Sequence, residues 1–278
     1  MSRNPYFIEG PALISFSGGR SSGYMLWHIL ASHGGKLPED IRVVFANTGK
    51  ERPETLDFVQ QISERWGVPI TWLEYRARSG PYLYEVVNHN SASRAGEPYD
   101  KAVRDRKSLP NPMMAFCSFE LKTLTIQRWC RTELGWTDYL NVVGLRADER
   151  ERMAAGLARN DGDAEAWNTY PMGDAGVTKQ MVSDFWPRPD GFDLGLPRVN
   201  GKTPAGNCTL CFKKGDATLV GLMRTYPDEI AWWVDHERAA TSVFRPKHTS
   251  YAALAKIAGE PDLLDFLDDD TRPCGCHD

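Results

Sequence analysis

The alternation of short apolar runs with amphipathic segments near the start of this chain constrains its fold most strongly. Apolar runs at 12–16, 41–46 and 70–75 have the length of buried strands, and the stretches between them carry apolar residues at helical spacing. Strands that alternate with helices in this way form a parallel sheet covered on both faces. The sequence therefore predicts an α/β fold with a doubly wound, mostly parallel sheet, and a similar run at 139–143 predicts a fourth strand.

Length, composition and charge exclude several classes of protein. The 278-residue chain has 41% hydrophobic and 25% charged residues, which is typical of a folded globule and not of a disordered or fibrous chain. The net charge of -4 provides no global positive field for nucleic acid or anionic lipid, so such a partner requires a local patch. Because the sequence shows no apolar run of 18 residues and no signal peptide, we expect a cytoplasmic protein without membrane contact.

A change of composition in the last third of the chain suggests a domain boundary. The stretch from 187 to 206 is rich in Pro and Gly, which is typical of connecting segments. We therefore predict a nucleotide-binding domain over 1–190 and a small cysteine-containing subdomain over 191–278 that packs on it. The polar, mainly basic segment from 76 to 111 is predicted to be a substrate loop or lid, with a short helix at about 82–87.

A Gly-rich turn joins the first predicted strand to the first predicted helix. Backbone N–H groups and the positive end of the helix dipole form an anion site at such a junction, and the glycines let a phosphate approach closely. The turn lacks the Gly-x-x-x-x-Gly-Lys-Ser/Thr spacing of a Walker A loop. The predicted phosphate-binding residues are Ser17, Gly18, Gly19, Arg20, Ser21 and Ser22.

The turn, together with Asn47-Thr48-Gly49 after the second strand, resembles the PP-loop superfamily, and in particular its phosphoadenylyl sulfate (PAPS) reductase branch. Gly144-Leu-Arg146 and the stretch 178–186 are similar to further motifs of that branch. The resemblance implies a Rossmann-like domain that binds the phosphates or sulfate of an adenine nucleotide, which is PAPS, APS or ATP. It also implies that Arg146 orients the anion. Asn47, Thr48 and Gly49 would lie beside the ribose and base.

One position departs from the ATP-cleaving members of this superfamily. Those enzymes carry Asp as the fifth residue of the loop, where this chain has Ser21. The missing carboxylate removes one ligand for Mg²⁺, a cation that prefers oxygen donors. Mg²⁺-dependent ATP chemistry therefore depends on a substitute such as Glu51 or Asp148.

The six cysteines indicate metal or redox chemistry rather than a disulfide framework in a reducing compartment. The resemblance implies a 4Fe–4S cluster held by thiolates, with neighbouring lysines that offset its negative charge. The fourth ligand stays open between Cys130, Cys274, Cys276 and no protein group, and zinc is the alternative metal. Cys130, in a predicted helix, is expected to be a buried apolar residue. The predicted metal ligands are Cys117, Cys208, Cys211 and Cys276.

The end of the chain carries a second possible role for cysteine. Cys274-Gly-Cys276-His277 resembles the C-terminal motif of PAPS reductases, whose cysteine attacks the sulfur of the nucleotide. The resemblance implies that Cys274 is the nucleophile and that His277 lowers its pKa together with an arginine such as Arg146. An external thiol such as thioredoxin would then release the product.

These motifs favour a PAPS reductase-like oxidoreductase that binds an adenine sulfonucleotide. One alternative is an ATP-dependent, 4Fe–4S-dependent sulfur transferase, in which the basic segment 76–107 contacts a nucleic-acid acceptor or the acceptor is a small molecule. Another alternative is a non-catalytic nucleotide or redox sensor. The oligomeric state, including a homodimer, stays open.

Overall fold

The computed structural model describes residues 4–161 and 164–260. The described chain divides into two compact units, here called the sheet unit (4–107, 115–161 and 164–209) and the helical unit (108–114 and 210–260). The observed division after Thr209 differs from the predicted boundary at 190. The reason is that the segment after 190 is bonded into the sheet unit, where Arg20 holds Asp193 and Thr203.

The sheet unit contains a six-stranded sheet with the order β4-β3-β2-β1-β5-β6. All neighbouring strands are parallel except the β3–β4 pair, which is antiparallel. The predicted α/β class and mostly parallel sheet are therefore confirmed, and the architecture is compatible with a Rossmann-like fold. The strands are β1 Ala12–Ser15, β2 Ile41–Asn47, β3 Ile70–Tyr75, β4 Tyr84–Val87, β5 Tyr139–Val143 and β6 Ala166–Thr169.

The short helix predicted at 82–87 is wrong, because this segment forms the edge strand β4. Tyr84 pairs with Tyr75 and Val87 with Trp72 in the antiparallel ladder. The adjacent β-branched residues Val86 and Val87 favour a strand, and an edge strand needs only one buried face.

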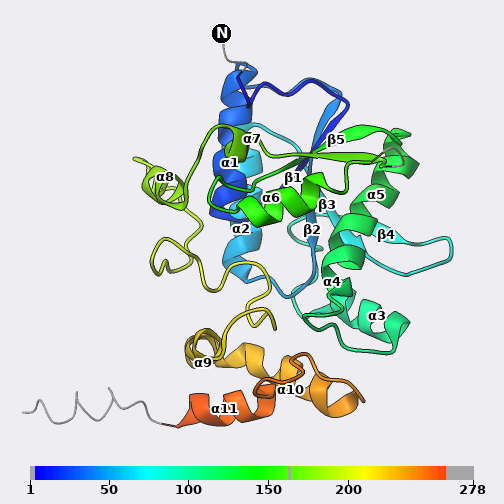
Figure 1. The fold of residues 1–278 in the computed structure, drawn as a ribbon, viewed down its shortest axis with the longest axis vertical. Coiled ribbons are helices and arrows are strands. Elements are labelled where there is room, and N and C mark those ends of the chain that lie inside the picture. The colour runs from blue at the N-terminus through cyan, green and yellow to red at the C-terminus, as the bar shows by residue number, and fades with distance from the viewer. Residues whose placement is uncertain (1–3, 162–163, 261–278) are drawn as a thin grey trace, which may run out of the picture. The chain divides into compact units, whose positions relative to one another are not determined.

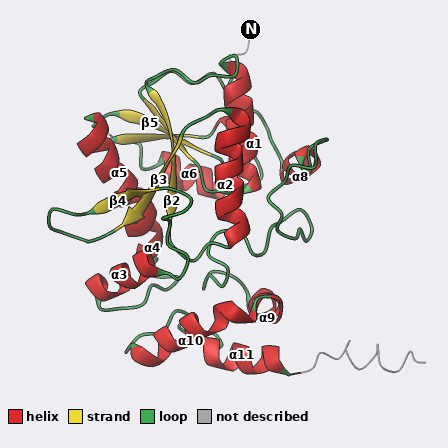
Figure 2. Ribbon diagram, turned by 180° about the vertical axis from the view of Figure 1, so that it is seen from behind, coloured by secondary structure: helices red, strands yellow, loops and turns green. Residues whose placement is uncertain are grey.

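Helices cover both faces of the sheet. Figures 1 and 2 show α1 and α2 side by side on one face and the α4–α5 segment on the other. The helices of this unit are α1 Arg20–Ser32, α2 Pro53–Trp66, α3 Glu97–Arg106, α4 Phe116–Ser118, α5 Thr125–Trp129, α6 Arg150–Leu157, α7 Pro171–Asp174 and α8 Lys179–Phe185, with π-helical turns η1 Phe119–Leu124 and η2 Cys130–Leu134.

The segment predicted as one amphipathic helix after Cys117 is helical over 116–134, with the two π-helical stretches inside it. Its apolar side chains Ile126 and Trp129 join a core cluster with Leu13 of β1, and the sulfur-bearing side chain of Cys130 lies in the same cluster. The expected burial of Cys130 is therefore confirmed, and that burial raises the pKa of its thiol to about 11.

The helical unit is built from α9 Asp216–Thr225, η3 Pro227–Glu229, α10 Ile230–Ala239 and α11 Tyr251–Gly259. Its core is aromatic, with the ring centroids of Trp233 and Tyr251 5.1 Å apart and those of Trp233 and Phe244 4.9 Å apart. In the described part of this unit Cys211 is the one cysteine. No helix among the described residues is long and apolar enough to cross a membrane.

Candidate anion and nucleotide site

The sheet unit contains a cavity of about 340 Å³ at the carboxyl ends of β1 and β5. The chain runs from β1 through β2 and β3 to β4 on one side and returns to β5 and β6 on the other, so β1 and β5 flank the switch point of the sheet. Ligands of doubly wound folds bind at such a switch point. The walls of the cavity are formed by the loop 17–22, residues 143–152, helix α8 and the segment 193–207, here called the strap.

The loop 17–22 lines the cavity with all six residues predicted to bind phosphate. The hydroxyl oxygen of Ser22 accepts hydrogen bonds from the backbone N–H of Ser17 (3.3 Å) and Gly19 (3.2 Å), and it donates one to the Gly19 carbonyl (2.9 Å). Gly18 has φ +72°, and a Cβ atom there would lie 2.7 Å from Cγ2 of Thr55. The loop is thus fixed against α2 at the N-terminus of α1, as an anion site requires.

The Arg20 side chain holds the strap. Its guanidinium makes a bidentate ion pair with Asp193, at 2.6 and 2.8 Å, and donates to the hydroxyl of Thr203 (2.6 Å) and the carbonyl of Leu196 (2.8 Å). The backbone carbonyl of Arg20 accepts from the indole of Trp186 at 3.2 Å. Arg20 therefore positions the wall of the cavity, whereas the sequence analysis predicted that it binds phosphate itself.

The Arg146 side chain reaches the loop from the end of β5. Its guanidinium donates to the Ser21 hydroxyl (3.0 Å) and to the carboxylates of Asp148 (2.9 Å) and Glu149 (3.2 Å). A Cβ atom on Gly144 would lie 3.4 Å from Cα of Ser22, so the backbone after β5 approaches the loop closely. The structure thus brings Arg146 and the loop 17–22 together, as predicted.

The cavity is lined by six basic side chains and one acidic side chain. Arg20 is neutralised by Asp193, but Lys179 and Lys202 have no ion-pair partner among the described residues. Such an excess of positive charge in a cleft attracts anions. The cations of α6, α8 and the strap could not be predicted from the sequence, because they belong to no contiguous motif. The basic residues are Arg20, Arg146, Arg152, Lys179, Arg198 and Lys202, and the acidic residue is Glu149.

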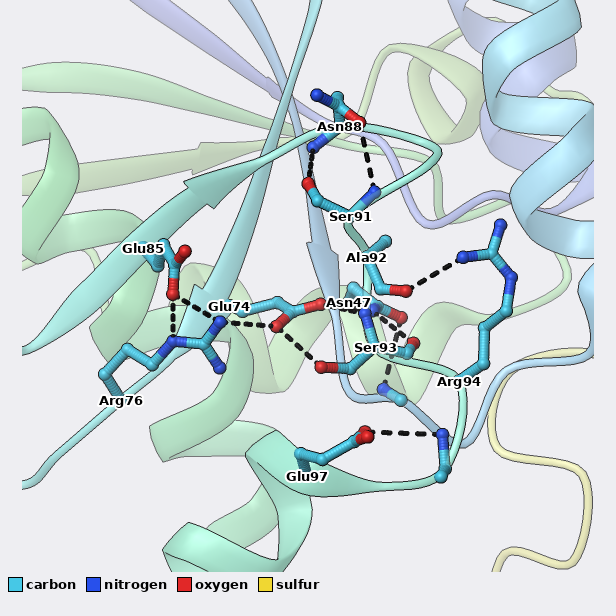
Figure 3. A network of polar contacts seen from close by, with 12 residues as sticks. Asn47, Glu74, Arg76, Glu85, Asn88, Ser91, Ala92, Ser93, Arg94 and Glu97 are labelled. Carbon is cyan, nitrogen blue, oxygen red and sulfur yellow. Dashed lines mark hydrogen bonds and ion pairs between the residues drawn. The ribbon is translucent and has the colours of Figure 1, made fainter.

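Asn47, Thr48 and Gly49 are buried at the end of β2 and are not among the residues that line the cavity. Figure 3 shows the polar network around Asn47. The Asn47 amide donates to Glu74 (2.7 Å) and to the Ser93 carbonyl (2.8 Å), and its oxygen accepts from the Gly49 N–H (3.1 Å). Asn47 therefore braces β2 against β3 and the loop after β4. The role beside the ribose and base stays a prediction.

Replacing Glu74 with Gln is expected to destabilise this network. The buried Glu74 carboxylate accepts from Asn47, from the Ser93 N–H (2.6 Å) and from the Ser93 hydroxyl (2.9 Å), and it pairs with Arg76 at 3.1 Å. In Gln, an NH₂ group replaces one of the two acceptor oxygens, and this group would face N–H and O–H donors. The free energy of unfolding should therefore fall by about 1–3 kcal/mol in urea denaturation. The control is Glu85→Gln, because Glu85 is an exposed partner of Arg76 and its loss should have little effect. Equal effects of the two changes would contradict this account.

Three of the seven basic side chains in the segment 76–107 form ion pairs with carboxylates, most of which lie outside the segment. Arg76 contacts Glu74 and Glu85, and Arg106 contacts Glu120 at 2.5 Å. The backbone of this segment forms β4 and α3. Carboxylates of the same unit therefore balance part of its local positive excess, and its role as a nucleic-acid contact surface stays a prediction.

Two of the predicted metal ligands lie near one lysine in the sheet unit. The ammonium of Lys122 is 3.4 Å from the carboxylate of Glu51. Burial lowers the pKa of Lys122, but the Glu51 carboxylate and the sulfurs of Cys208 and Cys117 outweigh this effect and raise it overall. The hydroxyl of Thr48 lies 3.4 Å from the Cys208 sulfur. The structure therefore places Cys117 and Cys208 in one polar environment next to Lys122.

Only part of the predicted set of metal ligands lies within the described residues. There, no three His, Cys, Asp or Glu side chains are arranged to hold a metal ion. Cys211 belongs to the helical unit, and Cys274, Cys276 and His277 lie outside the described residues. The 4Fe–4S cluster therefore stays a prediction.

The comparisons with known proteins give a relative without an assigned role. No family model matches the chain. The chain is 28% identical over 276 residues to the "Uncharacterized nin region protein ORF290" of Escherichia phage lambda, and the match covers 94% of this chain and 89% of that protein. The similarity therefore extends over most of both chains.

Proposed function

We propose that this chain binds an adenine nucleotide through its phosphate or sulfate groups in the cavity beside the loop 17–22. The observation that carries this proposal is the combination of a Gly-rich strand-to-helix loop with six basic side chains at the switch point of the sheet. Backbone N–H groups, the dipole of α1 and the cations all favour an anion at the same place. We further propose that the reaction is the thiol-dependent sulfur chemistry of a PAPS reductase-like oxidoreductase.

The composition of the cavity supports a sulfonucleotide over a Mg²⁺–ATP complex. Glu149 is the carboxylate among the described residues that line the cavity, and it already bridges Arg146 and Arg152. Ser21, at the position of the carboxylate in ATP-cleaving relatives, contacts Arg146. Mg²⁺ needs oxygen donors, whereas this cavity offers cations that neutralise the nucleotide directly.

The proposed reaction balances with one protein thiol and one external dithiol. The thiolate of Cys274 attacks the sulfur of the nucleotide, an S–S bond forms, and the S–O bond to the phosphate breaks. The nucleotide leaves with the electron pair of that bond, and Arg146 stabilises its phosphate. A thioredoxin-like dithiol then releases sulfite from Cys274 and becomes a disulfide.

Turnover tests this proposal. Purified protein with PAPS or APS and reduced thioredoxin is expected to release sulfite, and Cys274→Ser is expected to abolish the release. The matched control is Asp278→Asn, which changes the same C-terminal stretch of the sequence without removing a thiol and should retain turnover. Retained turnover in Cys274→Ser would overturn the proposed nucleophile. Cleavage of ATP to AMP and pyrophosphate, stimulated by an acceptor, would favour the sulfur transferase instead.

The iron and acid-labile sulfide content tests the cluster separately. If the cluster prediction holds, anaerobically purified protein contains about four irons per chain. Cys117→Ser and Cys208→Ser should then lose them. Zinc without iron would show that these residues hold a structural metal site.

A further inference from the structure

The one carboxylate in the described lining of the cavity lies between two arginines that also line it. The carboxylate of Glu149 pairs with Arg152 on one side and lies 3.2 Å from the guanidinium of Arg146 on the other. It also accepts the backbone N–H of Arg146 at 3.2 Å, and the side chain is 14% exposed. Glu149 is therefore fixed in the wall of a cavity that is otherwise built for anions.

The Glu149 carboxylate occupies guanidinium N–H donors of Arg146 and Arg152 that an anionic ligand would need. Guanidinium groups bind carboxylates and phosphates through the same N–H donors. An anion that enters the cavity must therefore replace the Glu149 carboxylate at Arg146 and Arg152, or bind next to it against like-charge repulsion. Asp148 differs, since it also pairs with Arg146 but is 41% exposed and does not line the cavity.

We propose that Glu149 is a specificity-determining residue that occupies the position of one anionic group of the ligand. A group with two negative charges, such as a phosphate monoester, gains attraction to the two arginines when it replaces the single charge of Glu149. A group with one negative charge gains nothing in the exchange. Glu149 thus selects ligands with a dianionic group. This inference rests on the proposed function, because it requires that a nucleotide binds in the cavity.

The test compares two probes and two variants. The probes are AMP, whose phosphate is largely dianionic above its second pKa of about 6, and the methyl ester of AMP, whose phosphate carries one charge. Glu149→Gln keeps the side-chain shape and an oxygen that can accept the Arg146 N–H. The matched control is Asp148→Asn, which also removes a carboxylate from Arg146 but leaves the cavity lining unchanged.

Calorimetric titration at low ionic strength measures the affinity of each protein for AMP and for its methyl ester. The wild-type protein is expected to prefer AMP over its methyl ester, and Glu149→Gln is expected to bind the ester about tenfold more tightly, so that the preference shrinks. Asp148→Asn should keep the wild-type preference. Weaker binding in Glu149→Gln, or the same shift in both variants, would show that Glu149 only orients Arg146. If AMP binds but Glu149→Gln prefers AMP over the ester as strongly as the wild type does, only the role of Glu149 is overturned. If neither probe binds to the wild type or to Glu149→Gln, the nucleotide site is overturned as well.

Discussion

Replacing Arg20 with Ala is expected to lower the free energy of unfolding by about 3–5 kcal/mol, because it leaves the largely buried Asp193 carboxylate without its partner. The change also removes the bonds that hold Thr203 and Leu196, so the strap loses its attachment to the loop. Nucleotide affinity should fall along with stability, since the strap contributes Arg198 and Lys202 to the cavity. Urea denaturation measures the first effect and calorimetric titration the second.

Two variants serve as controls for the Arg20 result. Arg131→Ala removes an ion pair with Glu165 that is mostly exposed, and such pairs contribute about 0–1 kcal/mol. Arg20→Lys keeps the charge but loses the planar fork that makes two bonds to Asp193, so an intermediate effect is expected. If Arg20→Ala were no more destabilising than Arg131→Ala, the strap would not depend on Arg20.

Replacing Gly18 with Ala is the second change with a large expected effect. The residue has φ +72°, and its new Cβ would lie 2.7 Å from Cγ2 of Thr55 and 3.1 Å from Cγ2 of Val59. The left-handed conformation alone costs a residue with a side chain about 1–2 kcal/mol, and the contact with α2 adds to this cost. The loop must shift to relieve the clash, so we expect a loss of stability and at least a tenfold loss of nucleotide affinity.

The neighbouring glycine provides the matched control for Gly18. Gly19 has φ -103°, and the nearest atom to a Cβ there is the Ser17 hydroxyl oxygen at 3.6 Å. Gly19→Ala should therefore fold with nearly wild-type stability, as measured by urea denaturation. Equal destabilisation by the two changes would show that the loop is not held by the contact between Gly18 and α2.

The central strands could be predicted from the sequence because parallel strands covered on both faces are nearly continuous apolar runs. Residues 70–75 and 139–143 form β3 and β5 at the predicted bounds. The edge strands gave no such signal. Strand β6, Ala166–Thr169, is half-buried throughout and has no apolar run, and β4 was mistaken for a helix.

The candidate site was predictable only where it is contiguous in the sequence. The loop 17–22 and Arg146 line the cavity. The place of the loop could be predicted because a Gly-rich turn between a strand and a helix lies at the end of that strand. The strap contributes its cations through tertiary contacts such as Arg20 with Asp193, which are 173 residues apart. No local pattern encodes such a contact. The same contact explains why Arg20 faces the strap, although its position in the loop suggested that it binds phosphate.

The most direct test of the nucleotide site is calorimetric titration of the wild-type protein with PAPS, APS and ATP in the presence of EDTA, together with Lys202→Ala. Lys202 lines the cavity without an ion-pair partner among the described residues, so its loss should weaken binding without unfolding the chain. Lys36→Ala, an exposed lysine outside the cavity lining, is the control. We expect salt-sensitive binding of at least one nucleotide, about tenfold weaker in Lys202→Ala and unchanged in Lys36→Ala. No binding of any of the three nucleotides, or equal affinities in the two variants, would contradict it.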